Sequence, residues 1–175
     1  GVDIMLGPEM KSTGEVMGID VDFGKAYLKS QIAASQLLPK KGNVFISVRD
    51  RDKDSIVAVA EQLHKMGFKI LSTAGTGKVL EKNRIPLTVL PKLSEGRPNI
   101  LDYIKNRDVK LIINTPSGRI PRQDEIVIRS TATLYRIPSI TTVAGAVASI
   151  KAIEALIKGD IGVESIQQHH KDIKR

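Results

Sequence analysis

Residues 72–77 read Ser-Thr-Ala-Gly-Thr-Gly, and these residue types could together hold a phosphate group. They stand where an apolar run ends and a helical pattern begins, and the N-terminus of a helix presents free N–H groups to an anion. The glycines would let the backbone approach the ligand closely, while Thr73 and Thr76 would offer hydroxyl donors. The segment matches neither the Walker A loop nor the Gly-x-Gly-x-x-Gly fingerprint. By itself it is also compatible with a plain turn, in which Thr76 would only cap the helix.

Polar residues follow four further predicted strands, and this arrangement strengthens the phosphate interpretation. In an open α/β sheet, ligands bind outside the carboxyl ends of the strands, so these segments are expected to share one edge. Each has an ordinary explanation on its own, because the charged run 49–54 is typical of a solvated loop and the segment 114–118 of a turn. Their coincidence on one edge favours an anion site. Besides Thr73 and Thr76, the residues expected there include Ser47, Lys53, Lys92, Asn114, Thr115, Ser117, Arg119 and Thr141.

Catalytic machinery is harder to find than a binding site. Proton transfer would need a carboxylate or imidazole at the same edge, where Asp50, Asp52 and Glu95 are expected to lie. Each of the three lies close to Arg or Lys in the sequence, which predicts an ion pair that keeps it ionised. Asp124 and Glu125 are best explained as partners of the N-terminal dipole of a helix. Because no Ser-His-Asp set and no metal-ligand cluster can be assembled, the sequence favours binding over catalysis.

Strands and helices alternate five times after residue 42, and this alternation positions the polar segments. It predicts a three-layer α/β fold with a five-stranded parallel sheet. The segment 1–40 differs, with turn formers followed by one helix over 22–35, so we place a domain boundary near 40–42 and assign 41–175 to the α/β domain. A short polar helix is expected after residue 159. The predicted strands are 43–48, 68–72, 86–90, 109–114 and 137–142, and the predicted helices are 53–66, 76–83, 99–107, 123–136 and 145–158.

Composition restricts the class of protein. The 175 residues suffice for one good core, and they contain no apolar run of membrane-spanning length. The absence of cysteine excludes disulfide and thiolate chemistry and fits a reducing cytoplasm. The formal charge of +8 attracts anions, but three Phe, three Tyr and no Trp leave little for base stacking, so a nucleic-acid binder is not expected. No secretory signal is recognisable, and the missing initiator Met suggests a piece of a longer chain.

The same motifs resemble the C-terminal end of the large subunit of carbamoyl phosphate synthetase, over essentially the full chain. Residues 7–18, Gly-Pro-Glu-Met-Lys-Ser-Thr-Gly-Glu-Val-Met-Gly, resemble the close of its second ATP-grasp half. The motifs at 46–53, 72–77, 92–100, 111–118 and 127–132 resemble, in order, those of the allosteric domain that follows. The resemblance implies a methylglyoxal-synthase-like fold that binds nucleotide effectors. UMP would inhibit, IMP would compete for the same pocket, and ornithine would activate from the border with the neighbouring synthetase domain.

The resemblance also implies roles for individual residues. The effector phosphate and its surroundings would be contacted by Ser47, Lys53, Thr73, Thr76, Lys92, Asn114, Thr115 and Ser117. Arg119, Val127 and Ile128 would face the ribose and base, and Thr141 would lie near the ornithine border. No cofactor is implied for this domain, whereas the parent enzyme uses ATP and Mg. The implied partners are the rest of the large subunit, the glutaminase small subunit and a second copy in an oligomer, in the cytoplasm, for pyrimidine and arginine synthesis.

The alternative within this fold is methylglyoxal synthase itself, a lyase that acts on a small phosphorylated substrate. Its catalytic aspartate lies in a Gly-Gly-Asp motif, whereas the corresponding stretch here is Glu-Gly-Arg-Pro-Asn, with Arg97 at that position. Its second loop begins Asp-Pro, where this chain has Thr115-Pro116. The allosteric domains usually carry a hydroxyl residue in place of Pro116, and Thr115 or Ser117 would have to substitute for it. Since an arginine cannot act as the required base, the lyase is disfavoured.

Overall fold

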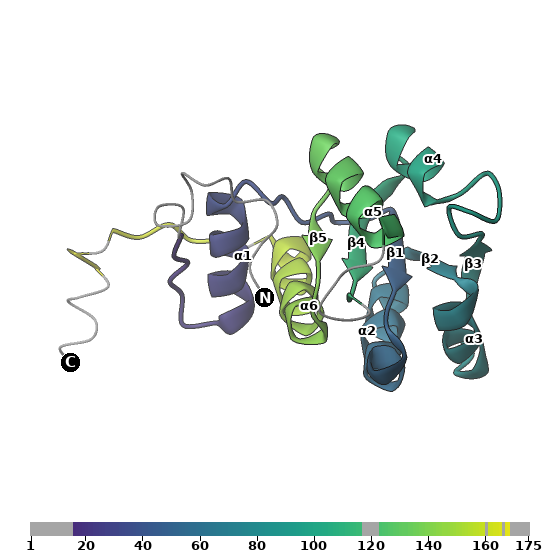
Figure 1. The fold of residues 1–175 in the computed structure, drawn as a ribbon. Coiled ribbons are helices and arrows are strands. Elements are labelled where there is room, and N and C mark those ends of the chain that lie inside the picture. The colour runs from purple at the N-terminus through teal and green to yellow at the C-terminus, as the bar shows by residue number, and fades with distance from the viewer. Residues whose placement is uncertain (1–15, 117–122, 160, 166, 169–175) are drawn as a thin grey trace.

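The computed structural model describes residues 16–116, 123–159, 161–165 and 167–168. Its centre is a five-stranded parallel sheet in the order β3-β2-β1-β4-β5 (Figure 1). The strands are β1 Asn43–Ser47, β2 Lys69–Thr73, β3 Leu87–Leu90, β4 Val109–Asn114 and β5 Ser139–Ile140. Since all five run in the same direction, their carboxyl ends lie along one edge of the sheet.

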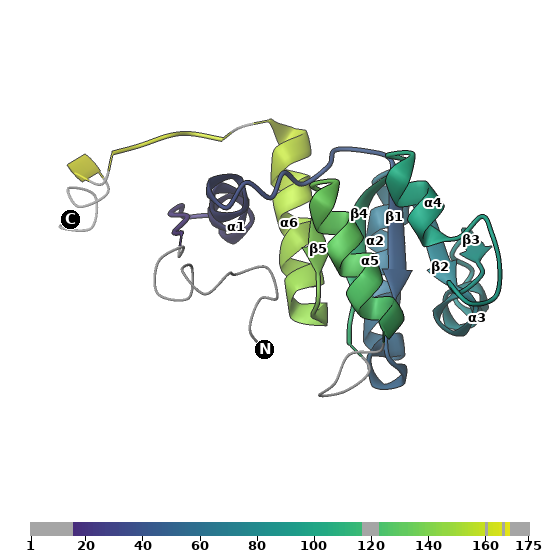
Figure 2. The same cartoon turned by 45° about the horizontal axis from the view of Figure 1, so that its top comes forward.

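Helices cover both faces of the sheet and give the three predicted layers. On one face of the sheet lie α2 (Lys53–Lys65), α3 (Ala74–Lys82) and α6 (Val143–Lys158), whose apolar side chains share one buried cluster. On the other face lie α4 (Ile100–Lys105) and α5 (Gln123–Leu134), whose apolar side chains share a second cluster. Figure 2 shows α4 and α5 on one side of β1 and α2 on the other. The residues of β1 alternate accordingly, because Val44 and Ile46 join the first cluster and Phe45 the second. The α/β fold class predicted from the sequence is therefore confirmed.

The ends of the helices show why the predicted element boundaries held or shifted. The helix α2 ends at Lys65, and Gly67, two residues later, adopts a φ of +88° while its N–H donates to the carbonyl of His64. The helix α3 begins at Ala74, earlier than the pattern predicted, and its N-cap residue is Thr73. Thr76 therefore lies inside the first turn, and the alternative that it only caps the helix is wrong. The strand β5 is shorter than predicted, with Pro138 directly before it.

The helix α1 (Phe23–Ala33) packs against α6 at the side of the sheet (Figure 1). Asp22 caps its N-terminus by accepting a hydrogen bond of 2.8 Å from the N–H of Lys25. Leu28 and Leu38 are buried in the same cluster as α2 and α6, so the segment before the predicted boundary contributes to the core of the α/β domain. The boundary at 40–42 itself stays a prediction, and most of the predicted C-terminal helix lies outside the described residues.

The longest helix among the described residues is α6, with 16 residues. Its N-cap, Thr142, accepts a hydrogen bond of 3.0 Å from the N–H of Gly145, and its C-cap, Gly159, has a φ of +84°. Seven of its residues are buried, which places it as a core helix beside β5. In the part of the chain that the structure describes, no helix is both long and apolar enough to cross a membrane.

Candidate functional site

A pocket of about 560 Å³ opens at the carboxyl ends of β1, β2 and β4. Segments from all four of the loops that follow β1, β2, β3 and β4 line it, as expected for an open α/β sheet. Its lining includes eight of the residues predicted from the sequence, namely Ser47, Lys53, Thr73, Thr76, Lys92, Asn114, Thr115 and Ile128. The structure thus brings together side chains that are up to 81 positions apart, from Ser47 to Ile128.

One side of the pocket carries hydrogen-bond donors and a positive charge. The hydroxyl groups of Ser47 and Thr73, at the ends of neighbouring strands, are 3.1 Å apart. Thr73 is the N-cap of α3 but its side chain makes no capping hydrogen bond, so its hydroxyl is not committed to the helix. The ammonium of Lys53 lies over the first turn of α3, since a Cβ added to Gly75 would be 3.4 Å from its Nζ. Helix N–H groups, two hydroxyls and an ammonium are the donors that a phosphate requires.

The ammonium of Lys53 has an exchangeable partner in this structure. Its Nζ lies 2.7 Å from Oδ1 of Asp50, whose side chain is 96% exposed. A pair that involves so exposed a carboxylate contributes little to stability, so a bound anion could replace the carboxylate at small cost. The ion pairs predicted for Asp52 and Glu95 are also present, with Arg49 at 2.7 Å and Lys92 at 3.5 Å.

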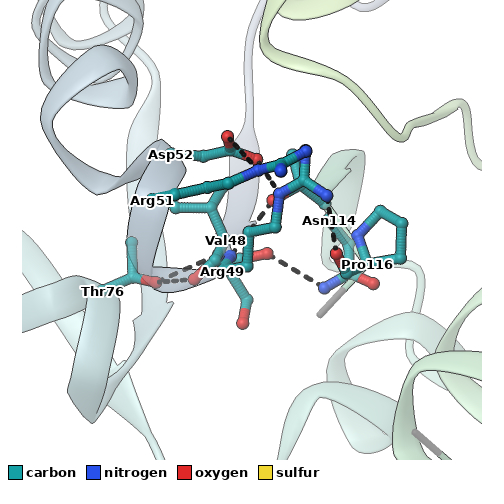
Figure 3. A network of polar contacts seen from close by, with 9 residues as sticks. Val48, Arg49, Arg51, Asp52, Thr76, Asn114 and Pro116 are labelled. Carbon is teal, nitrogen blue, oxygen red and sulfur yellow. Dashed lines mark hydrogen bonds and ion pairs between the residues drawn. The ribbon is translucent and has the colours of Figure 1, made fainter. Parts of the chain in front are cut away.

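The hydroxyls of Thr76 and Thr115 hold the loops of the pocket together. Thr76 is 1% exposed, and its Oγ1 accepts a hydrogen bond of 3.0 Å from the N–H of Val48 and donates one of 3.3 Å to the carbonyl of Val48. Thr115, also 1% exposed, accepts 3.1 Å from the N–H of Arg49. Figure 3 shows Thr76 beside Val48, at the end of β1. In this structure Thr76 therefore positions the β1–α2 loop, and its hydroxyl would have to change partner to contact a phosphate.

The side chain of Asn114 presents an acceptor rather than a donor. Its Nδ2 donates 2.9 Å to the carbonyl of Ser47, and this bond determines which way the amide is turned. Its Oδ1 is buried and has no hydrogen-bond partner among the described residues. A buried acceptor without a partner costs roughly 1–3 kcal/mol. This position therefore suits a ligand group that donates a hydrogen bond, such as a sugar hydroxyl, better than a phosphate oxygen.

Other predicted residues lie at the margin of the pocket or away from it. The Lys92 side chain is 55% exposed. The backbone N–H of Lys92 and then its ammonium lower the pKa of Glu95. Val127 is 37% exposed and does not line the pocket, and Thr141 is exposed beyond the end of β5. The predicted residues Ser117 and Arg119 lie outside the described part of the chain.

Some pocket residues were not singled out from the sequence as parts of the site. Phe45, Leu93 and Ile100 join Ile128 in an apolar wall, since all four line the pocket and belong to one apolar cluster. Their positions follow from burial and chain topology, which the residue types alone do not reveal. Asp124 and Glu125 occupy the first turn of α5, as predicted, and also line the pocket.

Arg97 lies outside this pocket, three residues before the start of α4. Its guanidinium is bonded to the carboxylate of Asp102, with Nε 3.0 Å from Oδ1, and Asp102 also accepts 2.8 Å from the N–H of Asn99. The Arg97 bond, and then the Asn99 N–H, lower the pKa of Asp102 to about 2. Since the folded pKa is depressed, this contribution to stability is complete above the ordinary pKa of 3.8 and is lost as the pH falls from there towards 2.

The Asp102 carboxyl is expected to titrate near pH 2 in the native protein, because its ionised form is held by Arg97. In Arg97→Met the midpoint should move up towards 3.8, the ordinary value. NMR titration of the side-chain carboxyl carbon measures both midpoints. The exposed, distant Lys69→Met serves as the control that removes one positive charge. A midpoint unchanged by Arg97→Met would contradict the assigned cause.

The chain is similar to known proteins in both sequence and fold. Residues 55–141 match the model of a family described as the MGS-like domain. This part of the chain is an MGS-like domain. This match spans from α2 to the residue after β5, and so contains most of the pocket segments. The domain is similar in fold to the methylglyoxal synthase of Elizabethkingia anophelis NUHP1, with a TM-score of 0.52 and 16% identity, covering 64% of this chain and 80% of that one.

Close relatives of this MGS-like chain are carbamoyl phosphate synthase large chains. It is 52% identical over 173 residues to that of Archaeoglobus fulgidus, covering 98% of this chain and 16% of the relative. It is 52% identical over 175 residues to the C-terminal section of the large chain of Methanocaldococcus jannaschii, covering 99% of this chain and 28% of the relative. The chain thus spans between a sixth and little more than a quarter of these relatives.

Proposed function

We propose that this MGS-like chain is the regulatory part of a carbamoyl phosphate synthase large chain and binds a nucleoside monophosphate effector. UMP is the expected effector, and IMP is expected to compete for the same pocket. The observation that carries the proposal is the convergence of Ser47, Lys53, Thr73 and the first turn of α3 in one pocket. These groups supply the hydrogen bonds and charge that a phosphate monoester needs.

The remainder of the pocket suits the nucleoside. An apolar wall of Phe45, Leu93, Ile100 and Ile128 offers a surface for a base, and Asn114 at the end of β4 lines the same pocket. A pocket of about 560 Å³ is of the size that ordinary small-molecule sites have, roughly 300–1,000 Å³. A ligand with a phosphate at one end and an apolar ring at the other would use both sides.

In this proposal the effector acts on a synthetase active site that lies elsewhere in the large chain. The parent would be an ATP- and Mg-dependent ligase that uses glutamine and bicarbonate, paired with a glutaminase small subunit in the cytoplasm and serving pyrimidine and arginine synthesis. Exposed apolar residues gather before and after α1, including Met17 at 71%, Val21 at 105% and Leu37 at 69%, and support contact with the rest of the large chain. Ornithine would bind near Thr141 at that border. Coupling between such sites is typically about 1–3 kcal/mol.

Calorimetric titration of this chain with UMP tests the proposal, with uridine, IMP and dihydroxyacetone phosphate as comparisons. Saturable binding of UMP and IMP, together with weak or absent binding of uridine, is the expected result, because the phosphate makes most of the contacts. Failure of every nucleotide to bind would contradict the proposed function. Turnover of dihydroxyacetone phosphate to methylglyoxal would instead support the lyase.

A further inference from the structure

Arg49, the second residue after β1, contacts two segments of the pocket at once. Its backbone N–H donates to Oγ1 of Thr115 at 3.1 Å, and its Nη1 donates to the carbonyl of Pro116 at 3.3 Å. Its Nε donates to Oδ2 of Asp52 at 2.7 Å. Figure 3 shows the guanidinium between Asp52 on one side and Pro116 on the other. The residue therefore bridges the β1–α2 loop and the start of the β4–α5 loop.

These contacts commit Arg49 to the protein rather than to a ligand. The side chain is 28% exposed and two of its three nitrogens donate to protein oxygens, in directions that a planar fork sets. Lys53 differs, since the side chain of its carboxylate partner is 96% exposed. Both residues line the pocket, but their contacts indicate different roles. Lys53 is suited to bind the anion, whereas Arg49 is suited to hold the two loops at a set separation.

That separation matters for a ligand that touches both sides. The donors Ser47 and Thr73 stand at the ends of β1 and β2, and Asn114 and Thr115 at the end of β4, on the other side of β1. Two strand spacings, about 10 Å, separate β2 from β4. A nucleotide spans this distance, but a free phosphate does not. Displacing Asn114 and Thr115 would therefore weaken the binding of a nucleotide while leaving the binding of a phosphate ion unchanged.

We propose that Arg49 is a positioning residue, which joins the β1–α2 loop to Thr115 and Pro116 at the end of β4, so that one ligand can contact both sides of the pocket. The inference rests on the proposed function, because it concerns the same pocket. The important property is the fork of the guanidinium, not its charge. A lysine keeps the charge but has a single nitrogen, which cannot reproduce the Nε and Nη1 contacts in their two directions.

The test measures dissociation constants of UMP and of inorganic phosphate for the full chain and for Arg49→Lys. We expect UMP to bind about tenfold more weakly to Arg49→Lys, because the two sides of the pocket lose their preorganisation. Inorganic phosphate should bind with an affinity within about twofold of the native value, since its expected contacts lie on one side. Arg136→Lys is the matched control, because Arg136 is exposed, follows the C-terminus of α5 and does not line the pocket. It should change neither constant.

Each other outcome has a definite meaning. Native affinity for UMP in Arg49→Lys would show that only the charge matters, and would overturn the inference. Equal losses for UMP and phosphate would make Arg49 a direct phosphate contact or a general structural residue, and would also overturn it. Thermal unfolding of both variants identifies a general loss of structure. If the native chain binds phosphate but not UMP, the proposed function itself fails, which is a different result from any of these.

Discussion

Replacing Lys53 with alanine should weaken UMP binding by roughly 10- to 150-fold, since charge-assisted hydrogen bonds contribute about 1.5–3 kcal/mol. The ammonium lies over the first turn of α3, close to Gly75 and facing the pocket. Its present partner, Asp50, is an exposed carboxylate that a phosphate would replace. Removing Lys53 leaves the hydroxyls and the helix N–H groups in place but takes away the charge that stabilises the anion. Isothermal titration calorimetry at one fixed ionic strength measures the change.

The matched control for Lys53→Ala is Lys82→Ala. Lys82 is the last residue of α3 and is exposed, at the opposite end of the helix from the pocket. Both variants lower the net charge by one unit, so a difference between them isolates position from overall charge. UMP affinity that falls equally in both would show that the effect is a long-range one. Unchanged affinity in Lys53→Ala would remove this residue from the site.

Replacing Phe68 with alanine should lower the free energy of unfolding by about 3–5 kcal/mol, the usual cost of deleting a buried phenyl ring. Phe68 is 1% exposed and follows the C-terminus of α2, where its N–H donates 3.1 Å to the carbonyl of Leu63. Its ring belongs to the cluster between the sheet and α2, α3 and α6. Domains of this size are stable by only about 5–15 kcal/mol, so the variant should unfold at much lower urea concentration. Circular dichroism during urea titration measures the shift.

Phe23→Ala provides the comparison with the same change of side chain. Phe23 begins α1 and is 57% exposed, with its ring stacked on Tyr27 at 6.2 Å and the ammonium of Lys151 at 5.5 Å. Such surface contacts contribute little, and we expect a loss of no more than about 1 kcal/mol. Equal losses in the two variants would contradict the assignment of Phe68 to the core.

Most of the strands were predictable because they are short, mainly apolar runs bounded by turn formers, whereas β5 is shorter than its pattern predicted. β4, for example, combines Val, Leu and Ile with five buried residues of six. The start of α3 was less predictable, since Thr73 and Thr76 are both acceptable N-cap residues by type. Local preference cannot choose between them. The choice depends on β2, which continues through Thr73 because Thr73 pairs with Leu90 of β3.

The site was predictable as a set of segments but not as a set of contacts. The rule that ligands bind beyond the carboxyl ends of parallel strands predicted which loops line the pocket. The contacts of Arg49 depend on Thr115 and Pro116, which lie 66 and 67 positions later in the chain. They also depend on the register that places Ser47 beside Asn114. A charged run in the sequence gives no information about such partners. The apolar wall was missed for the same reason, since its members come from β1, the β3–α4 segment and α5.

The ion pairs in the pocket have a consequence for how an anion would be recognised. Among the described residues that line it, the cations Arg49, Arg51, Lys53 and Lys92 are matched in number by Asp50, Glu95, Asp124 and Glu125. The excess positive charge of the chain as a whole is therefore not concentrated among them. A binding phosphate would displace a carboxylate from a lysine, because the pocket lining carries no net excess of positive charge among these residues. Selection would then take place at contact, where the shape and spacing of donors distinguish one small anion from another.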